Sequence, residues 1–342
     1  MKTLLTFGEI MMRLSPPGHL RFLQAGEFLV SFAGTESNVA VNLAHWGMDA
    51  AFLTKLPDNE LGQAAVNDLR RFGVDTSRVL RGGPRLGVFF VEKGASQRAS
   101  KVIYDRAGSS LAAACREEFD WDALLEGADW FHFSGITPAL GGQTPEICLD
   151  ACRAAKSKGL TVSCDTNYRA TLWSPSLAGK TMELLMPYVD VCFSNGGDAA
   201  ALFGIHPRNQ GRTAPGEALS QEAYLDVALQ LAERFSLRQV AFTMRQGQSA
   251  DVNRWQGMFW DGRDAFFSRE YTIQLVDRIG GGDAFDAALL YALRRGQSSQ
   301  EAVELAAAAS CLQQTIEFDY SLVSLEEALA LAAGEASGRI RR

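Results

Sequence analysis

The sequence is poor in the residues that build disulfide scaffolds and metal centres. Its 342 residues include six cysteines and four histidines, and no two cysteines form a C-x-x-C pair. Cys148 and Cys152 are four positions apart on one predicted helix, where buried thiols behave as small apolar groups. Scattered thiols are typical of reduced, cytoplasmic proteins, so we expect neither a disulfide nor a thiolate metal site.

Long apolar runs are also lacking. No stretch approaches the roughly 20 apolar residues that a membrane-spanning helix requires. Glu9 and Arg13 interrupt the apolar start of the chain before the core of a signal peptide is complete. We therefore expect a cytoplasmic protein with no membrane partner.

The chain has no excess of basic charge. Its 33 Lys and Arg residues are outnumbered by 40 Asp and Glu residues, which gives a net charge of −7 at pH 7. The charges are interspersed, so the basic surface that binds a phosphate backbone is missing, and we expect no nucleic-acid partner. Hydrophobic residues make up 47% and charged residues 21% of the chain, as in ordinary folded proteins.

Three common nucleotide-binding signatures are absent. The sequence contains no G-x-x-x-x-G-K-[ST], which excludes a P-loop, and no H-R-D loop, which excludes the protein-kinase catalytic motif. Its cluster of glycines at 280–282 is not G-x-G-x-x-G, because Phe285 occupies the sixth position. A nicotinamide dehydrogenase therefore loses support, although the α/β pattern described next would suit one.

Apolar runs of strand length alternate with helical patterns, which is typical of parallel βαβ units. We predict a doubly wound, mostly parallel sheet with helices on both faces, in a single α/β domain that spans residues 1–342. The predicted strands are 4–7, 51–55, 130–134, 161–165, 191–194 and 240–244, and the predicted helices are 38–46, 61–72, 145–158, 283–295 and 299–315.

Two stretches break this alternation. Residues 13–32 and 87–107 have the pattern of antiparallel strands outside the main sheet. They predict a small antiparallel β lid formed by about 10–35 and 85–108, and lids of this kind close over substrates and exclude water. Residues 204–220 predict an exposed loop, and the basic end at 338–342 a frayed tail.

The most informative segment is 276–285, a strand end that runs through three glycines directly into a helix. Gly280, Gly281 and Gly282 allow backbone amides to converge at the positive end of the helix dipole, which predicts an anion-binding hole. Asp283 follows at once. It would suit a helix N-cap, but beside a phosphate site its carboxylate also suits a base that takes a proton from an attacking hydroxyl.

Residues 277–283 resemble the D-x-x-G-x-G-D signature of the ribokinase-like (PfkB) sugar kinases, and 34–38 resemble the first signature of that family. The segments 104–108, 131–138 and 165–169 resemble its 2-keto-3-deoxygluconate kinase branch. The resemblance covers essentially the whole chain. It implies the ribokinase-like fold and transfer of the ATP γ-phosphoryl group to the 6-hydroxyl of 2-keto-3-deoxygluconate, with Asp283 as the base.

The resemblance also implies how the sugar acid is bound. Gly34 and Asn38 would face the sugar, although Asn38 would equally suit the cap of the helix it begins. Tyr104, Arg106 and Arg169 match the positions that hold the carboxylate. A planar guanidinium can donate two hydrogen bonds to a carboxylate, whereas the alternative for each arginine is an ordinary solvated surface charge.

For the nucleotide and its metal, the resemblance implies contacts near several strand ends. Asp198 stands where the family orders the water shell of Mg²⁺, with Gly196 and Gly197 in place of the usual acidic residues, and a turn in which Asp198 caps the next helix is the alternative. The residues implied to bind ATP are Asn167, Asn195, Thr243, Arg245, Gly247, Gly280 and Gly282.

Two further positions depart from the family pattern. If the carboxylates of Asp286 and Asp283 both faced one pocket, their repulsion would raise the proton affinity of one of them, but acidic residues favour first helical turns for dipole reasons alone, and we predict that simpler role. Phe89 replaces a tyrosine that the branch often has. A neutral-sugar kinase (a fructokinase or a 5-keto-2-deoxygluconate kinase) and a non-catalytic sugar-acid sensor therefore remain alternatives. The resemblance also implies a homodimer formed through the lid.

Overall fold

The computed structural model describes residues 2–208, 219–247 and 249–335, and a twisted sheet forms the centre of this part of the chain. The strand order is β14-β13-β12-β11-β10-β9-β1-β4, and β15 also pairs with β13. All neighbours from β4 to β12 are parallel, whereas β13 pairs antiparallel with its three neighbours. The strands are β1 (Thr3–Phe7), β4 (Ala50–Leu53), β9 (Ala128–Ser134), β10 (Thr161–Asp165), β11 (Val191–Ser194), β12 (Gln239–Gly247), β13 (Val252–Trp260), β14 (Ala265–Phe267) and β15 (Tyr271–Gln274).

Helices cover both faces of this sheet, which is why its parallel strands are nearly continuous apolar runs. Leu5 and Phe7 of β1 pack among residues of α3 to α8 on one face, and Leu4 packs against α1, α9 and α10 on the other. The helices are α1 (Thr35–His45), α2 (Glu60–Arg71), α3 (Trp121–Leu124), α4 (Ile136–Ala139), α5 (Thr144–Ser157), α6 (Pro175–Leu185), α7 (Gly196–Phe203), α8 (Gln221–Phe235), α9 (Gly281–Arg294), α10 (Ser299–Gln313) and α11 (Leu325–Ala333). The predicted doubly wound, mostly parallel sheet with helices on both faces is confirmed.

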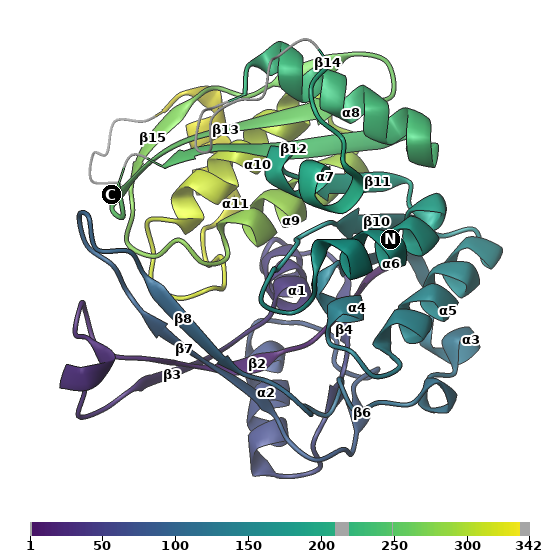
Figure 1. The fold of residues 1–342 in the computed structure, drawn as a ribbon, viewed down its shortest axis with the longest axis vertical. Coiled ribbons are helices and arrows are strands. Elements are labelled where there is room, and N and C mark those ends of the chain that lie inside the picture. Colours follow the sequence, from purple (N-terminus) through teal and green to yellow (C-terminus); the bar gives the residue numbers. More distant parts are fainter. Residues whose placement is uncertain (1, 209–218, 248, 336–342) are drawn as a thin grey trace.

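A second, smaller sheet projects from the body as a lid (Figure 1). Its order is β3-β2-β7-β8, formed by β2 (Met11–Ser15), β3 (Leu29–Ala33), β7 (Gly87–Glu92) and β8 (Lys101–Asp105). The two outer pairings are antiparallel and the middle one, β2 with β7, is parallel. These four strands fall inside the two ranges predicted for the lid. A separate pair, β5 (Lys55–Leu56) and β6 (Leu80–Arg81), lies beside α2.

The structure differs from the predicted elements mainly at one sheet edge and at element ends. The antiparallel strands β13 to β15, the short strand β6 and the helices α3, α4, α6, α7, α8 and α11 were not predicted. In addition, α1 begins at Thr35 instead of 38 and α9 begins at Gly281 instead of 283. The predicted tail at 338–342 and most of the predicted loop at 204–220 lie outside the described residues.

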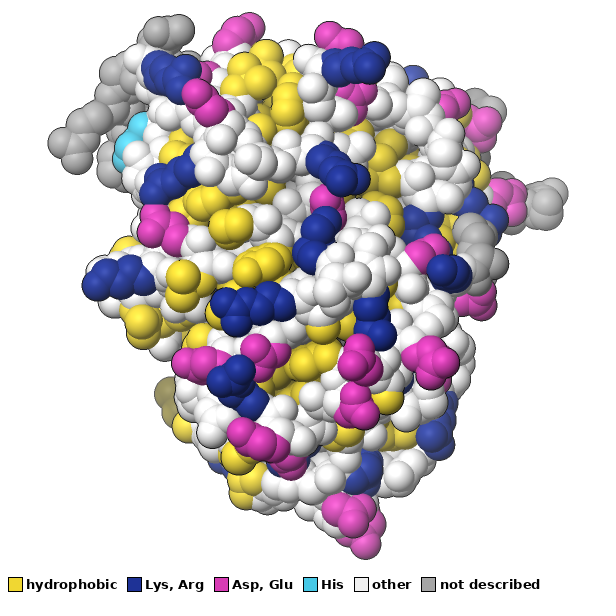
Figure 2. Space-filling model, turned by 90° about the vertical axis from the view of Figure 1, so that its right-hand side faces the viewer, with side chains coloured by type: hydrophobic (Ala, Val, Ile, Leu, Met, Phe, Trp, Pro, Cys, Tyr) yellow, Lys and Arg dark blue, Asp and Glu magenta, His cyan; other side chains and the backbone are white. Residues whose placement is uncertain are grey.

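The distribution of surface charge and the state of the cysteines can be compared with what the sequence analysis expected. Figure 2 shows basic and acidic side chains interspersed over one face, without a large region of one sign. All six cysteines are free, and burial raises the pKa of the Cys148 and Cys152 thiols. Within the described residues, no helix combines the length and the apolar character needed to span a bilayer.

Candidate functional site

A cavity of about 580 Å³ opens between the lid and the carboxyl ends of the central strands, where doubly wound folds bind ligands. Met11 and Phe89 line it from the lid, and Phe193 and Ala241 line it from the sheet. The structure brings most of the predicted site residues to its wall: Gly34, Asn38, Asn167, Arg169, Asn195, Thr243, Arg245, Gly280, Gly281, Gly282 and Asp283.

The glycine turn presents free backbone amides to this cavity. Gly280 has a φ of +87° and is the N-cap of α9, which therefore lacks a side-chain cap. A Cβ on Gly280 would lie 2.2 Å from the carbonyl oxygen of Asp319, so only glycine fits there. The first amides of α9 remain available for an anion, and the dipole of a 14-residue helix strengthens the site.

Asp283 is the third residue of α9 and does not cap it. Its carboxylate accepts a 2.6 Å hydrogen bond from the side-chain amide of Asn38 and lines the cavity. Burial raises the pKa of Asp283 to about 7, although the hydrogen bond from Asn38 lowers it. A carboxylate whose pKa lies near neutrality has the proton affinity that a general base needs at physiological pH.

The prediction that Asp286 acts only through the dipole of its helix is wrong. The residue is 2% exposed and lines the cavity one turn after Asp283, because positions three apart share a helix face. Its Oδ2 atom has no hydrogen-bond partner. Burial raises the pKa of Asp286, and the Asp165 and Asp283 carboxylates raise it further. Burial likewise raises the pKa of Asp165.

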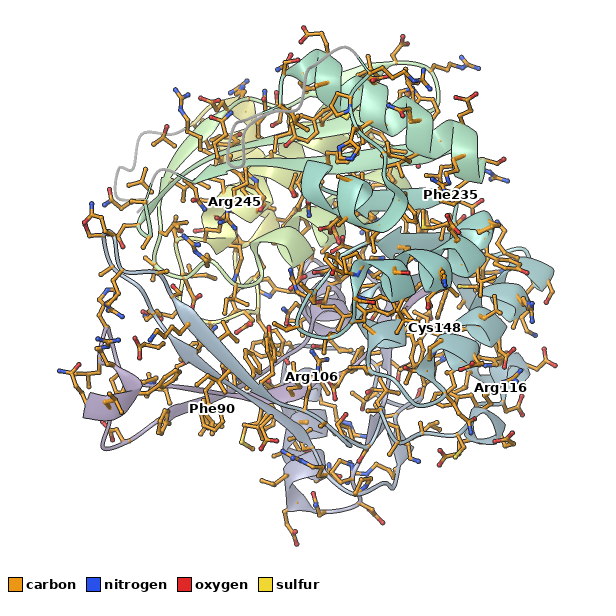
Figure 3. All side chains as sticks on the ribbon, viewed as in Figure 1. Phe90, Arg106, Arg116, Cys148, Phe235 and Arg245 are labelled. Carbon is orange, nitrogen blue, oxygen red and sulfur yellow. The ribbon has the colours of Figure 1, made fainter. Side chains whose placement is uncertain are left out.

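Three arginines bring positive charge to the cavity. Arg169 follows β10, Arg245 lies on β12, and Arg278 lies in the turn before α9. None of them forms an ion pair with a carboxylate of the described residues, so their charge is available to a ligand. Figure 3 shows Arg245 on the sheet of the body, away from the lid. Burial and the Arg278 guanidinium lower the pKa of Arg245, but arginine stays protonated in proteins.

Tyr104 and Arg106 do not line the cavity in this structure. Arg106 lies near the base of the lid (Figure 3), where its buried guanidinium forms an ion pair with Glu9. Tyr104 on β8 is 43% exposed and stacks on Phe89, with ring centroids 5.9 Å apart. Their contact with a sugar acid stays a prediction, and Glu9, which had no role in the sequence analysis, is the partner that holds Arg106.

Two predicted nucleotide or metal residues also lie outside the cavity wall. The carboxylate of Asp198 is buried and accepts hydrogen bonds from the Tyr168 amide at 3.0 Å and the Thr166 hydroxyl at 3.2 Å. The residue that caps α7 is Asn195, not Asp198, since the side chain of Asn195 accepts the Asp198 amide. Gly247 lies at the exposed end of β12.

The family model for "pfkB family carbohydrate kinase" matches residues 1–317. The chain belongs to the pfkB family of carbohydrate kinases. Its sequence is 34% identical over 335 residues to a 2-dehydro-3-deoxygalactonokinase of Haloferax volcanii, and the match covers 98% of each chain. It is 28% identical to a 2-dehydro-3-deoxygluconokinase of Thermoproteus tenax, covering 91% of this chain and 88% of the relative.

A solved structure also relates the chain to this family. A crystal structure of 2-dehydro-3-deoxygluconokinase from Thermotoga maritima superimposes with a TM-score of 0.93 at 48% identity, covering 97% of this chain and 98% of the other. The pfkB assignment agrees with the α/β fold and the lid. It excludes the nicotinamide dehydrogenase considered from the α/β pattern.

For this pfkB kinase, several cavity residues were missed by the sequence analysis. Asp165 was noted only as part of a motif, and Arg278 only as part of the glycine segment. Asp319 lies 36 residues after Asp283 and reaches the cavity wall through a turn. A charged residue at a strand end was the available signal for Asp165, but no local pattern distinguishes Asp319.

Proposed function

We propose that this pfkB kinase transfers the γ-phosphoryl group of ATP to the 6-hydroxyl of 2-keto-3-deoxygluconate, also named 2-dehydro-3-deoxygluconate. The observation that carries the proposal is a carboxylate of near-neutral pKa, Asp283, in one cavity with the free amides of the glycine turn and the unpaired guanidinium of Arg169. A base, an anion site and a cation for a substrate carboxylate are the three groups that this reaction requires.

Each group has a defined part in the reaction. The 6-oxygen forms a bond to the γ-phosphorus while the bond from that phosphorus to the bridging oxygen breaks, and ADP leaves. Asp283 takes the hydroxyl proton. The amides of Gly280, Gly281 and Gly282 stabilise the charge on the transferred group, and Arg169 orients the acid end of the sugar. Arg245 and Arg278 bind the nucleotide phosphates.

The residues of the cavity also fit Mg²⁺ as the companion of ATP. This ion prefers hard oxygen ligands and needs few protein carboxylates, because phosphates and waters complete its shell. The partnerless Oδ2 of buried Asp286 and the carboxylate of Asp165 are such donors, and Asp198 would act through water. Mg²⁺ would supply neutralisation of the polyphosphate charge.

The names of the relatives support a sugar acid as the substrate and introduce a second candidate substrate. Kinases named for the gluco acid and for its C4 epimer, the galacto acid, both resemble this chain over most of its length. The Haloferax volcanii relative therefore favours 2-dehydro-3-deoxygalactonate as a second substrate.

One coupled ATP-turnover assay tests these proposals. Purified enzyme with Mg²⁺ is given each epimeric sugar acid, fructose and 5-keto-2-deoxygluconate in parallel. We expect the highest kcat/KM with the gluco acid and measurable turnover of the galacto acid. Faster turnover of fructose or 5-keto-2-deoxygluconate would overturn the assignment, and binding of the acid without ATP consumption would identify a sensor.

We also propose a homodimer formed through the lid, in the cytoplasm. One face of the lid sheet carries exposed apolar side chains, including Val30 and Ile103 at 58% and 54% exposure, which the strand register places on the same side as Phe90. Phe90 of β7, labelled in Figure 3, forms an aromatic group with Phe22 and Phe28, which lie in the segment between β2 and β3. The six free thiols and the use of ATP support the cytoplasm.

Analytical ultracentrifugation tests the dimer. We expect wild-type protein to sediment as a dimer and Ile103→Glu, which puts a charge on the exposed lid face, to sediment as a monomer. An exposed apolar residue away from the lid, Leu184, gives the control variant Leu184→Glu, which keeps the dimer. A monomeric wild type would contradict the proposal.

A further inference from the structure

Arg13 is a fully buried arginine in the lid strand β2, and among residues 2–208, 219–247 and 249–335 it is the largest side chain buried to this degree. Its guanidinium donates hydrogen bonds to Asp277 Oδ2 at 2.5 Å and to Asp319 Oδ2 at 2.6 Å. A third hydrogen bond, 2.9 Å long, goes to the hydroxyl of Ser15. One side chain of the lid therefore holds two carboxylates of the body.

The two carboxylates, Asp277 and Asp319, belong to the segments that flank the glycine turn at 280–282. Asp277 begins the turn, and its second oxygen accepts the backbone amide of Ile279 at 3.2 Å. Asp319 lines the cavity, and its carbonyl oxygen lies against Gly280 at the position that a Cβ would take. The position of Arg13 therefore determines how the two segments that flank the free amides sit relative to each other.

The charges make this arrangement dependent on Arg13. Burial raises the pKa of Asp319 to about 6, the Arg13 guanidinium lowers it, and the nearby Asp277 carboxylate raises it. Within the described residues, neither aspartate has an ion pair with another cation. Two buried carboxylates with one shared counter-ion separate or take up a proton when that ion is withdrawn.

On the lid, Arg13 is connected to the surface that faces the sugar site. Its register partner across the parallel pairing is Phe89, which lines the cavity. Met11, two residues before Arg13 on the same strand, lines the cavity as well. Because β2 is hydrogen-bonded on both edges, a shift of the lid over a bound sugar moves Arg13 with it.

We propose that Arg13 is a positioning residue that couples the lid to the phosphate-binding turn, so that a sugar acid under the lid and a nucleotide phosphate at 280–282 strengthen each other's binding. The identity of the two ligands rests on the proposed function. The coupling is reciprocal, since each ligand changes the affinity of the other by the same factor.

The test measures this factor in the full-length protein. Isothermal titration calorimetry gives the Kd of a non-hydrolysable ATP analogue with Mg²⁺, in the absence and in the presence of saturating 2-keto-3-deoxygluconate. We expect the sugar acid to tighten nucleotide binding about tenfold in wild type, within the usual range for coupled sites. In Arg13→Lys we expect less than about twofold, because an ammonium keeps the charge but lacks the planar fork that reaches both aspartates.

Two further variants separate coupling from folding. Arg98→Lys is the matched control, because Arg98 is a lid arginine that pairs with Glu92 and not with the turn, and it keeps the wild-type factor. Arg13→Met combined with Asp277→Asn and Asp319→Asn removes all three charges, so that no carboxylate is left buried without a partner. We expect this triple variant to fold, which near-UV circular dichroism checks, and to lack the coupling.

An equal coupling factor in wild type, Arg13→Lys and the triple variant would overturn the role of Arg13, and so would the absence of coupling in wild type. Turnover by the wild-type enzyme tests the proposed substrate separately. If the enzyme phosphorylates a different sugar, the coupling is measured with that sugar, and the outcome for Arg13 is decided in the same way.

Discussion

The side-chain amide of Asn38 donates a 2.6 Å hydrogen bond to the carboxylate of Asp283, although 245 positions separate the two residues. The bond joins α1 to α9, and with them the two segments that resemble family signatures at opposite ends of the chain. A donor to the charged form of a carboxylate stabilises that form. Asn38 therefore opposes the effect of burial and keeps Asp283 ionisable near neutral pH.

We predict that Asn38→Ala raises the pKa of Asp283 and shifts the acidic limb of the pH profile of kcat/KM upward by about one pH unit. Hydrogen bonds to charged groups contribute about 1.5–3 kcal/mol, and one pKa unit corresponds to about 1.4 kcal/mol. Rates measured from pH 5 to 9 give the limb. The control is Asn42→Ala, a buried asparagine one turn away on α1. A lower kcat/KM with an unmoved limb would mean that Asn38 only contacts the sugar.

We predict that Asp283→Asn folds and binds nucleotide but loses about 10²- to 10⁴-fold in kcat, the usual contribution of a positioned base. The amide keeps the shape of the side chain and cannot accept the proton. Calorimetry with the ATP analogue and single-turnover kinetics separate binding from chemistry. Asp122→Asn, at a highly exposed side chain, is the control with wild-type rate. Turnover of Asp283→Asn near the wild-type rate would show that Asp283 is not the general base.

We predict that Arg169→Ala lowers kcat/KM for the sugar acid about 10- to 100-fold more than for a neutral sugar, since a guanidinium donates two charge-assisted hydrogen bonds to a carboxylate. Steady-state kinetics with the gluco acid and with fructose give the two ratios. Arg153→Ala, at an exposed arginine of α5, leaves both ratios unchanged. Equal losses on both sugars would show that Arg169 does not recognise the acid group.

The parts of the site that were predictable from sequence are those that local patterns specify. Asn167, Arg169 and Asn195 follow predicted strands, and the family resemblance placed them at the ligand site, which lies where the parallel strands end. Three successive glycines before a helix specify the turn at 280–282 on their own. Asn38 and Asp283 were placed in one site because each belongs to a segment with a family resemblance.

The parts that were not predictable depend on which distant segments meet. Arg13 and Asp319 are 306 positions apart, and nothing in either local sequence indicates their ion pair. The ion pair between Arg106 and Glu9 was not predicted either, because no local pattern indicates that the two residues meet. Asp286 was expected to act through the helix dipole alone, yet α9 is buried on nearly every side and places this carboxylate in the cavity wall.

The burial of Asp286 leads to a prediction about stability. Its pKa is raised in the folded state by burial and by the Asp165 carboxylate, so the folded protein binds a proton that the unfolded chain releases at lower pH. The free energy of unfolding therefore falls as pH rises from the ordinary aspartate pKa toward the raised value. Asp286→Asn removes a buried carboxylate whose Oδ2 has no partner. The variant therefore lacks the free-energy cost of ionising a buried carboxyl group.

We accordingly expect Asp286→Asn to be more stable than wild type at pH 8, by about 1–3 kcal/mol, and to differ little from it at pH 4, where the wild-type carboxyl is already protonated. Guanidinium denaturation at both pH values measures the difference. Asp122→Asn, at an exposed side chain, stays within about 0.5 kcal/mol of wild type at both. A stabilisation of equal size at pH 4 and pH 8 would show that the gain comes from packing and not from the buried charge.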